Sequence, residues 1–269
     1  MDRSPVVAGR FYTSDGAELS VEVNGYLNTA DVPGVQPTLL AMVPHAGYMF
    51  SGAVAGKTLG AANLASTVLL LGPNHTGKGE PLAVWPDGKW LYPGGCLGVE
   101  EMFAQALLED IPALTADTKA HDMEHSLEVV VPFLAALNPV STCVPIAVAE
   151  HRLDVLREVA AGMAAVIQKR GNPVSVVVSS DMSHFVSADQ ARELDGLALQ
   201  AVLDLDPERL FREVRDRHIT MCGVLPMTMG LMVAKALGAS RAELVEYTNS
   251  GVVSGDYEQV VGYAGVLVS

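Results

Sequence analysis

Apolar residues fall into short continuous runs along most of the chain. Such runs are typical of strands buried on both faces of a sheet, where the simple alternation of a half-exposed strand is lost. Six strands are expected, at residues 39–43, 68–71, 142–148, 174–184, 243–248 and 260–268. The fourth is interpreted as one strand that carries Asp181 and His184 at its end.

The segments between these runs carry apolar residues at the three- and four-residue spacing of helices. The expected helices cover about residues 15–27, 100–108, 123–137, 153–169, 188–203 and 223–237. Ser51 is expected to cap a further helix, Pro207 to open another, and Pro132 to kink the helix at 123–137 or mark its restart. Alternating strands and helices predict an α/β fold, a single domain of residues 1–269 with a largely parallel mixed sheet covered by helices on both faces.

Two segments depart from this alternation. Residues 31–37, DVPGVQP, have the composition of a linker. Residues 80–98 contain several Gly and Pro residues that mark turns between short strands, so this segment is expected to be an irregular insertion over the sheet.

Histidines follow three of the apolar runs. His45, His75 and His184 each come after a run and a short segment of Gly, Pro, Asn, Ser or Asp. A buried imidazole must find polar partners or cost free energy, so these positions are better suited to a site than to the core. In open α/β sheets ligands bind outside the carboxyl ends of the parallel strands. The three histidines are therefore predicted to converge on one crevice.

Composition and charge restrict the class of partner. The chain has 269 residues and a formal net charge of −14, without a cluster of Lys and Arg, so neither nucleic acid nor an anionic membrane is an expected partner. A small molecule or another protein is expected instead. No apolar run is long enough to span a bilayer and the start lacks a signal-peptide pattern, which favours a cytoplasmic location. Three widely spaced cysteines argue against a disulfide scaffold.

The segment GPNHTGKG, residues 72–79, nearly matches the phosphate-binding loop GxxxxGK[ST] and follows a strand. Gly79 stands where that loop needs a hydroxyl for magnesium, and Glu80-Pro81 follows instead of a helix that would hold the phosphate. No nucleotide site is therefore expected here.

His121, Glu124 and His125 spell H-x-x-E-H, the inverted zinc-protease signature, in which two helical histidines bind zinc and the Glu is a general base. Five-residue patterns recur by chance, and His121 lies at the expected edge of a loop. The alternative interpretation is that His125 and Glu128 line a pocket while His121 is solvated. His151 and His218 lie beside charged residues and are expected on the surface.

Cys222 lies just before the expected helix at 223–237. A thiol at a helix N-terminus can have its thiolate stabilised by the helix dipole, which would favour a reactive or metal-binding role. A buried structural cysteine is the alternative, and residue chemistry alone leaves both open.

Seven sequence blocks give the chain a family resemblance. They are AGRFY, VPHAGYMFSG, LGPNH, EHSLEVVVPFL, SSDMSHF, MCGVLP and SGDYEQVVGYAG, in this order through nearly the whole length. The sequence resembles the Memo family, whose bacterial and archaeal members are also known as the B component of the AmmeMemoRadiSam system. The family is related in fold to the class III extradiol ring-cleaving dioxygenases. A Memo-like domain with that dioxygenase-like fold is therefore expected.

The resemblance also implies a mononuclear metal site. Its implied members are the ligands His45, His75 and Cys222, the catalytic candidates His184 and Asp181 beside the metal, and the substrate-pocket residues Glu124, His125 and Tyr48. Iron is the expected metal, with copper and zinc as alternatives, because a thiolate is a softer ligand than the carboxylate of the dioxygenases. Ser183 and Thr76 stand where relatives carry a thiol and a second histidine, so a cysteine redox pair is not expected and His75 is the ligand of its loop.

The implied activity is that of a metal-dependent oxidoreductase, dioxygenase-like, acting on an unidentified small molecule. Ring cleavage would need the His184 imidazole as general base, with Asp181 fixing its tautomer. The alternative is a non-catalytic metal-binding or protein-interaction module that retains an old active site; a zinc peptidase would need His121 as a ligand. The family name also implies a functional link to a radical SAM protein.

Overall fold

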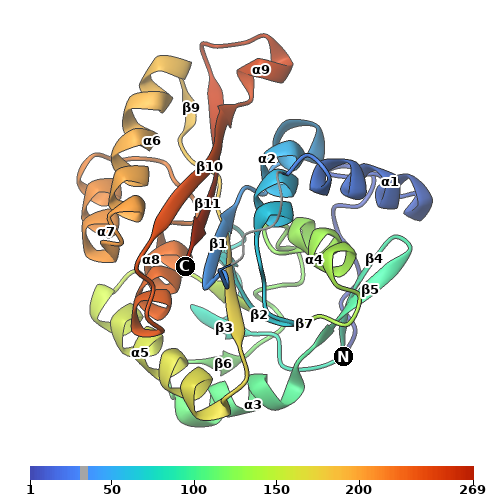
Figure 1. Ribbon diagram of the computed structural model, residues 1–269, viewed down its shortest axis with the longest axis vertical. Helices are drawn as coiled ribbons and strands as arrows, with labels where there is room; N and C mark the ends of the chain where they lie inside the picture. Colours follow the sequence, from blue (N-terminus) through green and yellow to red (C-terminus); the bar gives the residue numbers. More distant parts are fainter. Residues whose placement is uncertain (31–35) are drawn as a thin grey trace.

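The protein is described by a computed structural model that covers residues 1–30 and 36–269 and has a twisted eleven-stranded sheet at its centre (Figure 1). Most of the expected linker at 31–37 lies outside the described residues. In spatial order the sheet contains β10 (Ala242–Asn249), β11 (Val260–Val268), β1 (Leu40–Val43), β8 (Val174–Ser179), β2 (Thr67–Pro73), β7 (Thr142–Val148), β3 (Leu82–Val84) and β6 (Thr115–Ala116). β4 (Lys89–Tyr92) forms a hairpin with β5 (Gly95–Val99), which joins β7, and β9 (His184–Val186) pairs with β11.

The centre of the sheet is parallel and its flanks are antiparallel. β1, β8, β2 and β7 run parallel to one another, whereas β11 pairs antiparallel to β1 and β3 pairs antiparallel to β7. All residues of β1, β2 and β8 are buried, as expected for strands covered on both faces. The predicted α/β class with a largely parallel mixed sheet is confirmed.

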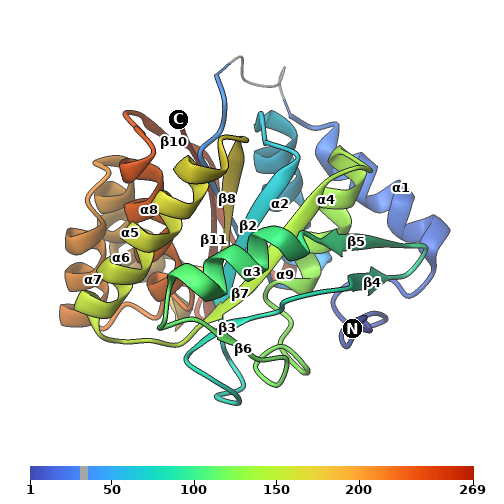
Figure 2. The ribbon, with the colours of Figure 1, turned by 90° about the horizontal axis from the view of Figure 1, so that it is seen from below.

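Helices cover the two faces of the sheet, as Figure 2 shows. α1 (Gly16–Leu27), α2 (Tyr48–Ala61) and α4 (Val131–Leu137) pack on one face, while α3 (Glu101–Asp110), α5 (Leu153–Arg170), α6 (Ala188–Leu203), α7 (Pro207–Asp216) and α8 (Val224–Ala236) pack on the other. Successive residues of a strand point to opposite faces. Leu40 and Met42 therefore pack on the face covered by α3, α5, α6, α7 and α8. Ala41 and Val43 pack on the face covered by α1, α2 and α4. No helix in the described ranges is long and apolar enough to cross a bilayer.

Three local expectations differ from the structure. The helix assigned to Ser51 begins at Tyr48, because Ser51 lies inside the first turn and its hydroxyl donates to the Ala46 carbonyl oxygen. The expected helix at 123–137 is helical only from the 3-10 turn Glu128–Val130 onward, and Pro132 lies in the first turn of α4. The expected strand at 174–184 ends at Ser179, and His184 begins the separate strand β9.

Candidate metal centre

Two of the predicted site histidines lie at the carboxyl ends of two parallel strands that flank a third. His45 follows β1 and His75 follows β2, and β8 lies between these two strands in the sheet. The loop after β8 fixes the first histidine, because the His45 backbone N–H donates to Asp181 Oδ1 at 2.8 Å. The ends of β1 and β2 and the loop after β8 therefore lie together, with His45 and His75 on the two outer strands.

His125 completes a group of three imidazoles with His45 and His75. One ring nitrogen of each lies within 4.8 Å of the others, a spacing that could hold a metal ion. The rings of His75 and His125 are stacked with centroids 4.8 Å apart, and the His45 ring stands edge-on to both. His125 comes from the turn before the Glu128–Val130 segment rather than from a strand end.

Hydrogen bonds fix which nitrogen of His45 can bind a metal. Its Nδ1 contacts Ser179 Oγ, and the Ser179 hydroxyl donates its hydrogen to the Ser126 carbonyl oxygen at 2.6 Å. The serine oxygen can therefore only accept, so Nδ1 of His45 carries the proton. The lone pair then lies on Nε2, the nitrogen available to a metal.

Glu124 has the same effect on His75. Its carboxylate is fully buried, with Oε1 2.8 Å from His75 Nδ1 and 3.0 Å from the Ser126 backbone N–H that donates to it. Burial alone would raise the pKa of Glu124, but the hydrogen bonds and charge of His75 and the Ser126 N–H lower it to about 2. A carboxylate on the outer nitrogen of a ligating histidine is the usual support of a protein metal site. Glu124, expected on a pocket wall, therefore orients His75.

Cys222 is the nearest soft donor to these histidines. Its Sγ lies 3.2 Å from His45 Nε2 and accepts the Asp181 backbone N–H at 3.3 Å. Nitrogen and sulfur ligands of one tetrahedral ion, at about 2.0 and 2.3 Å from it, lie roughly 3.5 Å apart. The donor set and this spacing fit a transition metal, although Cys222 is outside the group of three imidazoles.

The free thiol differs from the thiolate that a helix N-terminus would favour. Burial and the charge of Asp181 raise the pKa of Cys222 well above its usual value. Gly223 precedes α8 and brings this segment close to β8, since its N–H donates to Ser180 Oγ at 3.0 Å. A Cβ at this position would lie 2.3 Å from that of Ser180. Because its pKa is raised, the free Cys222 thiol is protonated at neutral pH.

His184 and Asp181 lie at different depths beside these donors. Asp181 is buried, its Oδ2 is 4.0 Å from His45 Nε2, and burial raises its pKa to about 6. His184 is half-buried, and its Nδ1 donates to the Thr220 carbonyl oxygen at 3.0 Å. The tautomer of His184 is therefore fixed by Thr220 rather than by Asp181, and its Nε2 bears the lone pair.

Tyr48 and His121 are both committed to structural contacts. The Tyr48 hydroxyl donates to the Val129 carbonyl oxygen at 2.7 Å and its ring packs against Phe133. The prediction that His121 is solvated is wrong: its ring is fully buried between the two tryptophans Trp85 and Trp90. The H-x-x-E-H segment is not helical, so the two histidines do not have the one-turn spacing of a zinc protease.

Comparison with known proteins identifies the family. The model of the Memo family, described as Memo-like protein, matches residues 3–267. The chain belongs to the Memo family. A MEMO1 family protein of Methanopyrus kandleri is 39% identical over 279 residues, and one of Aquifex aeolicus is 36% identical over 266 residues. The alignments cover 99% and 98%, respectively, of both chains compared.

A solved structure shares the fold of this Memo-family chain. An uncharacterized protein from Escherichia coli K12 superposes with a TM-score of 0.54 at 15% identity, covering 84% of this chain and 98% of the other. At this identity the likeness concerns the fold alone. The α/β arrangement that presents the strand ends is therefore found in a distant sequence.

Proposed function

We propose that the crevice binds one transition-metal ion through His45, His75 and Cys222, with His125 as a neighbouring donor. The observation that carries this proposal is the fixed tautomer of His45, which directs its Nε2 lone pair to within 3.2 Å of the Cys222 sulfur. The Glu124 contact supports a matching role for His75, since it leaves Nε2 of that ring for the ion.

Two imidazoles and one thiolate are compatible with iron, copper or zinc. We propose iron as the native ion, because the proposed ligand set resembles that of the related dioxygenases, in which two histidines and a third, anionic ligand hold iron. When bound, such an ion supplies Lewis-acid or one-electron redox chemistry.

We propose a metal-dependent oxidoreductase activity on a small molecule, with His184 as the acid–base residue. Its Nδ1–H is held by the Thr220 carbonyl oxygen, so Nε2 is ready to take a proton from a substrate hydroxyl. Asp181 can hold a proton near neutral pH, because burial raises its pKa to about 6. These two residues would hold and transfer protons beside a bound ion.

One observation favours a second candidate, a metal-binding or interaction module without turnover. A cavity of about 660 Å³ lies between residues 9–14 and 47–50, and it is lined by Phe11 but by none of the three proposed ligands. The Phe11 ring packs on the His125 ring with centroids 4.7 Å apart, so the cavity borders the imidazole group through Phe11 and not through a proposed ligand. In this second function the protein would serve a partner, for which a radical SAM protein is the proposed class.

Metal analysis of protein purified without oxygen tests the metal site. We expect about one equivalent of iron in the parent protein and in the control His151→Ala, whose exposed side chain is outside the centre. His45→Ala and His75→Ala should contain almost none while remaining folded. Full metal content in either ligand variant would refute the site.

Oxygen uptake by the iron-loaded protein separates the two functions. A panel of catechols and other small phenols should contain a compound that stimulates uptake in the parent and not in His184→Ala. If no compound in the panel stimulates uptake although one ion is bound, the non-catalytic function is favoured.

A further inference from the structure

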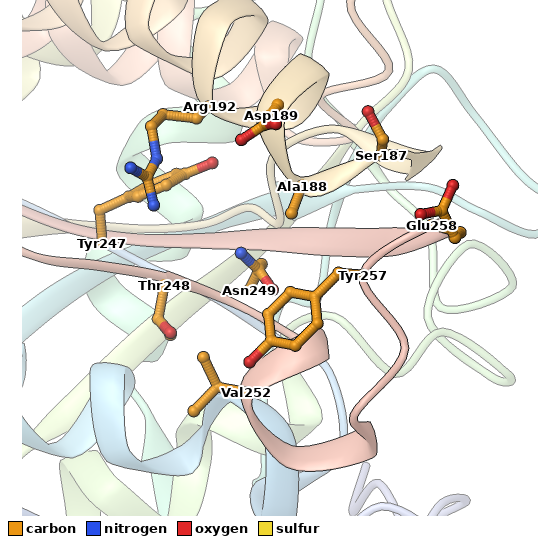
Figure 3. A pocket seen from close by; sticks show the side chains of 10 residues that line it. All are labelled: Ser187, Ala188, Asp189, Arg192, Tyr247, Thr248, Asn249, Val252, Tyr257 and Glu258. Atoms are coloured by element: carbon orange, nitrogen blue, oxygen red, sulfur yellow. The ribbon is translucent and has the colours of Figure 1, made fainter.

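A second cavity, of about 500 Å³, lies apart from the metal centre (Figure 3). It is bounded by the start of α6, the end of β10, and the segment around α9 (Gly251–Ser254). His45, His75, Cys222 and Asp181 are not among the residues that line it. A ligand in this cavity would therefore not contact the proposed metal ligands, and its binding does not depend on the proposed function.

Asn249 supplies a side-chain NH₂ donor to the cavity. The residue is only 7% exposed, and its Oδ1 accepts the Gly251 backbone N–H at 2.9 Å. That contact fixes the orientation of the amide, so the other atom is the NH₂ group, which Figure 3 shows pointing into the cavity. No acceptor for it is found among the residues that the structure describes. Its nitrogen is not among the fully buried, unpaired side-chain atoms of the described residues, so water reaches it from the cavity, and an acceptor on a ligand can take the place of that water.

Arg192 provides a cation on the same side of the cavity. Its guanidinium forms no ion pair with a carboxylate in the described ranges 1–30 and 36–269, and it lies beside the Tyr247 ring in Figure 3. The Tyr247 hydroxyl is already committed to Asp195 Oδ2 at 2.8 Å. Arg192 and the Asn249 amide therefore form a pair of donors suited to a carboxylate.

Two carboxylates face the same space. Asp189 lies near Arg192 at the start of α6, and Glu258 lies on the opposite side of the cavity beside Ser187. Neither side chain has an ion-pair partner among the described residues. With one cation and two anions the lining has a formal charge of −1, and the whole chain carries −14. A simple anion would be repelled, whereas a ligand with one carboxylate and two cationic groups would be complementary.

We propose that this cavity binds a basic α-amino acid of the lysine type. Arg192 and Asn249 bind its carboxylate, Asp189 its α-ammonium group, and Glu258 its side-chain cation. The Tyr257 ring and Val252 lie along the lower side of the cavity in Figure 3 and cover the aliphatic stem.

Calorimetric titration with lysine and four analogues tests each group of the ligand. Norleucine lacks the side-chain cation, cadaverine lacks the carboxylate, Nα-acetyl-lysine lacks the α-ammonium group and stands for a peptide C-terminus, and glutamate reverses the side-chain charge. We expect lysine to bind at least tenfold more tightly than any of the four. The proposal is overturned if lysine does not bind at millimolar concentration or if norleucine binds equally well. It is also overturned if Nα-acetyl-lysine binds more tightly than lysine, because the ligand would then be the C-terminus of a peptide and not a free amino acid.

Three variants assign the contacts. Arg192→Gln should lower lysine affinity at least tenfold, and Glu258→Gln should remove the preference for lysine over norleucine. Asn249→Asp keeps the acceptor for the Gly251 N–H and removes the donor, so it should weaken lysine binding too. Arg212→Gln, on α7 outside the cavity, is the matched control and should bind like the parent. If Arg192→Gln and Glu258→Gln both bind lysine as tightly as the parent, the assignment of these two contacts is refuted.

Discussion

The sulfur of Cys222 lies 3.2 Å from Nε2 of His45, although the two residues are 177 positions apart in the chain. The loop after β8 holds both. Asp181 accepts the His45 backbone N–H with its carboxylate and donates its own N–H to the Cys222 sulfur, and Ser180 accepts the Gly223 N–H. The geometry of the proposed metal site therefore depends on a loop that contributes no ligand to it.

Metal binding should release a proton from Cys222. Burial and Asp181 raise the pKa of this thiol, so it is protonated at neutral pH, and a metal-bound sulfur is a thiolate. Titration in buffers of different ionisation enthalpy should show about one more proton released by the parent than by Cys222→Ala. Alkylation followed by mass spectrometry gives a second test, because metal should protect Cys222 and leave the exposed Cys96 unaffected. Equal proton release and equal labelling would remove the sulfur from the coordination sphere.

Glu124→Gln should weaken metal binding without preventing folding. The carboxylate orients His75, and loss of such a support typically costs about 10–100-fold in metal affinity. Competition with a chelator measures the change. Glu80→Gln, on the exposed loop after His75, is the control and should bind metal like the parent. Affinity in Glu124→Gln equal to that of this control would show that the carboxylate only supports the turn.

Sequence reasoning located His45 and His75 because each follows a fully buried parallel strand. The same reasoning predicts His184 at the end of a third parallel strand. The chain instead leaves β8 at Ser179, and His184 starts an antiparallel strand against β11. A histidine that follows an apolar run is therefore expected to join the others only where the parallel strand itself leads to that histidine.

The sequence predicts His125 on the wall of the pocket, whereas the structure places its ring in the group of three imidazoles. It lies on a turn, and neither hydrophobic periodicity nor strand-end logic applies to a turn. The apolar spacing predicts a helix over the EHSLE segment, but contacts of Glu124 with His75 and of Ser126 with the ends of β2 and β8 override that preference. The H-x-x-E-H pattern and the family resemblance are the two signals that mark this segment.

Glu128→Ala should strongly destabilise the fold. The Glu128 carboxylate accepts from Arg3 Nη1 at 2.8 Å, from the Tyr12 hydroxyl at 2.7 Å, and from the Val6 and Val7 backbone N–H groups. Removing it leaves a buried guanidinium unpaired, which costs about 3–5 kcal/mol. Urea unfolding measures the loss, with the exposed Glu193→Ala as control. A loss below about 1 kcal/mol would mean that the N-terminal arm is held by other contacts.

His121→Gln should leave metal binding unchanged. The His121 ring is enclosed by Trp85 and Trp90 and its Nε2 donates to the Ala83 carbonyl oxygen at 3.0 Å, so neither nitrogen reaches the ion. The same chelator competition measures the affinity. A large loss of zinc affinity, together with peptide hydrolysis by the parent, would favour the peptidase instead.

The pH dependence of stability should also report on His121. Burial lowers its pKa to about 4, from about 6.5 in the unfolded chain. Between these values the unfolded state binds a proton that the native state does not, so stability falls as the pH drops below 6.5, and the loss stops growing below 4. At pH 5 this one group should cost about 2 kcal/mol relative to pH 7.5. Urea unfolding of metal-free protein at both pH values should therefore show a smaller pH-dependent loss in His121→Gln than in the parent. The difference between the two proteins cancels the shifts of other groups, such as His125 and Glu124, that both contain. His151→Gln, at an exposed position, should show the parent's full loss. A loss in His121→Gln equal to the parent's would mean that His121 takes up its proton in the native state as readily as in the unfolded chain.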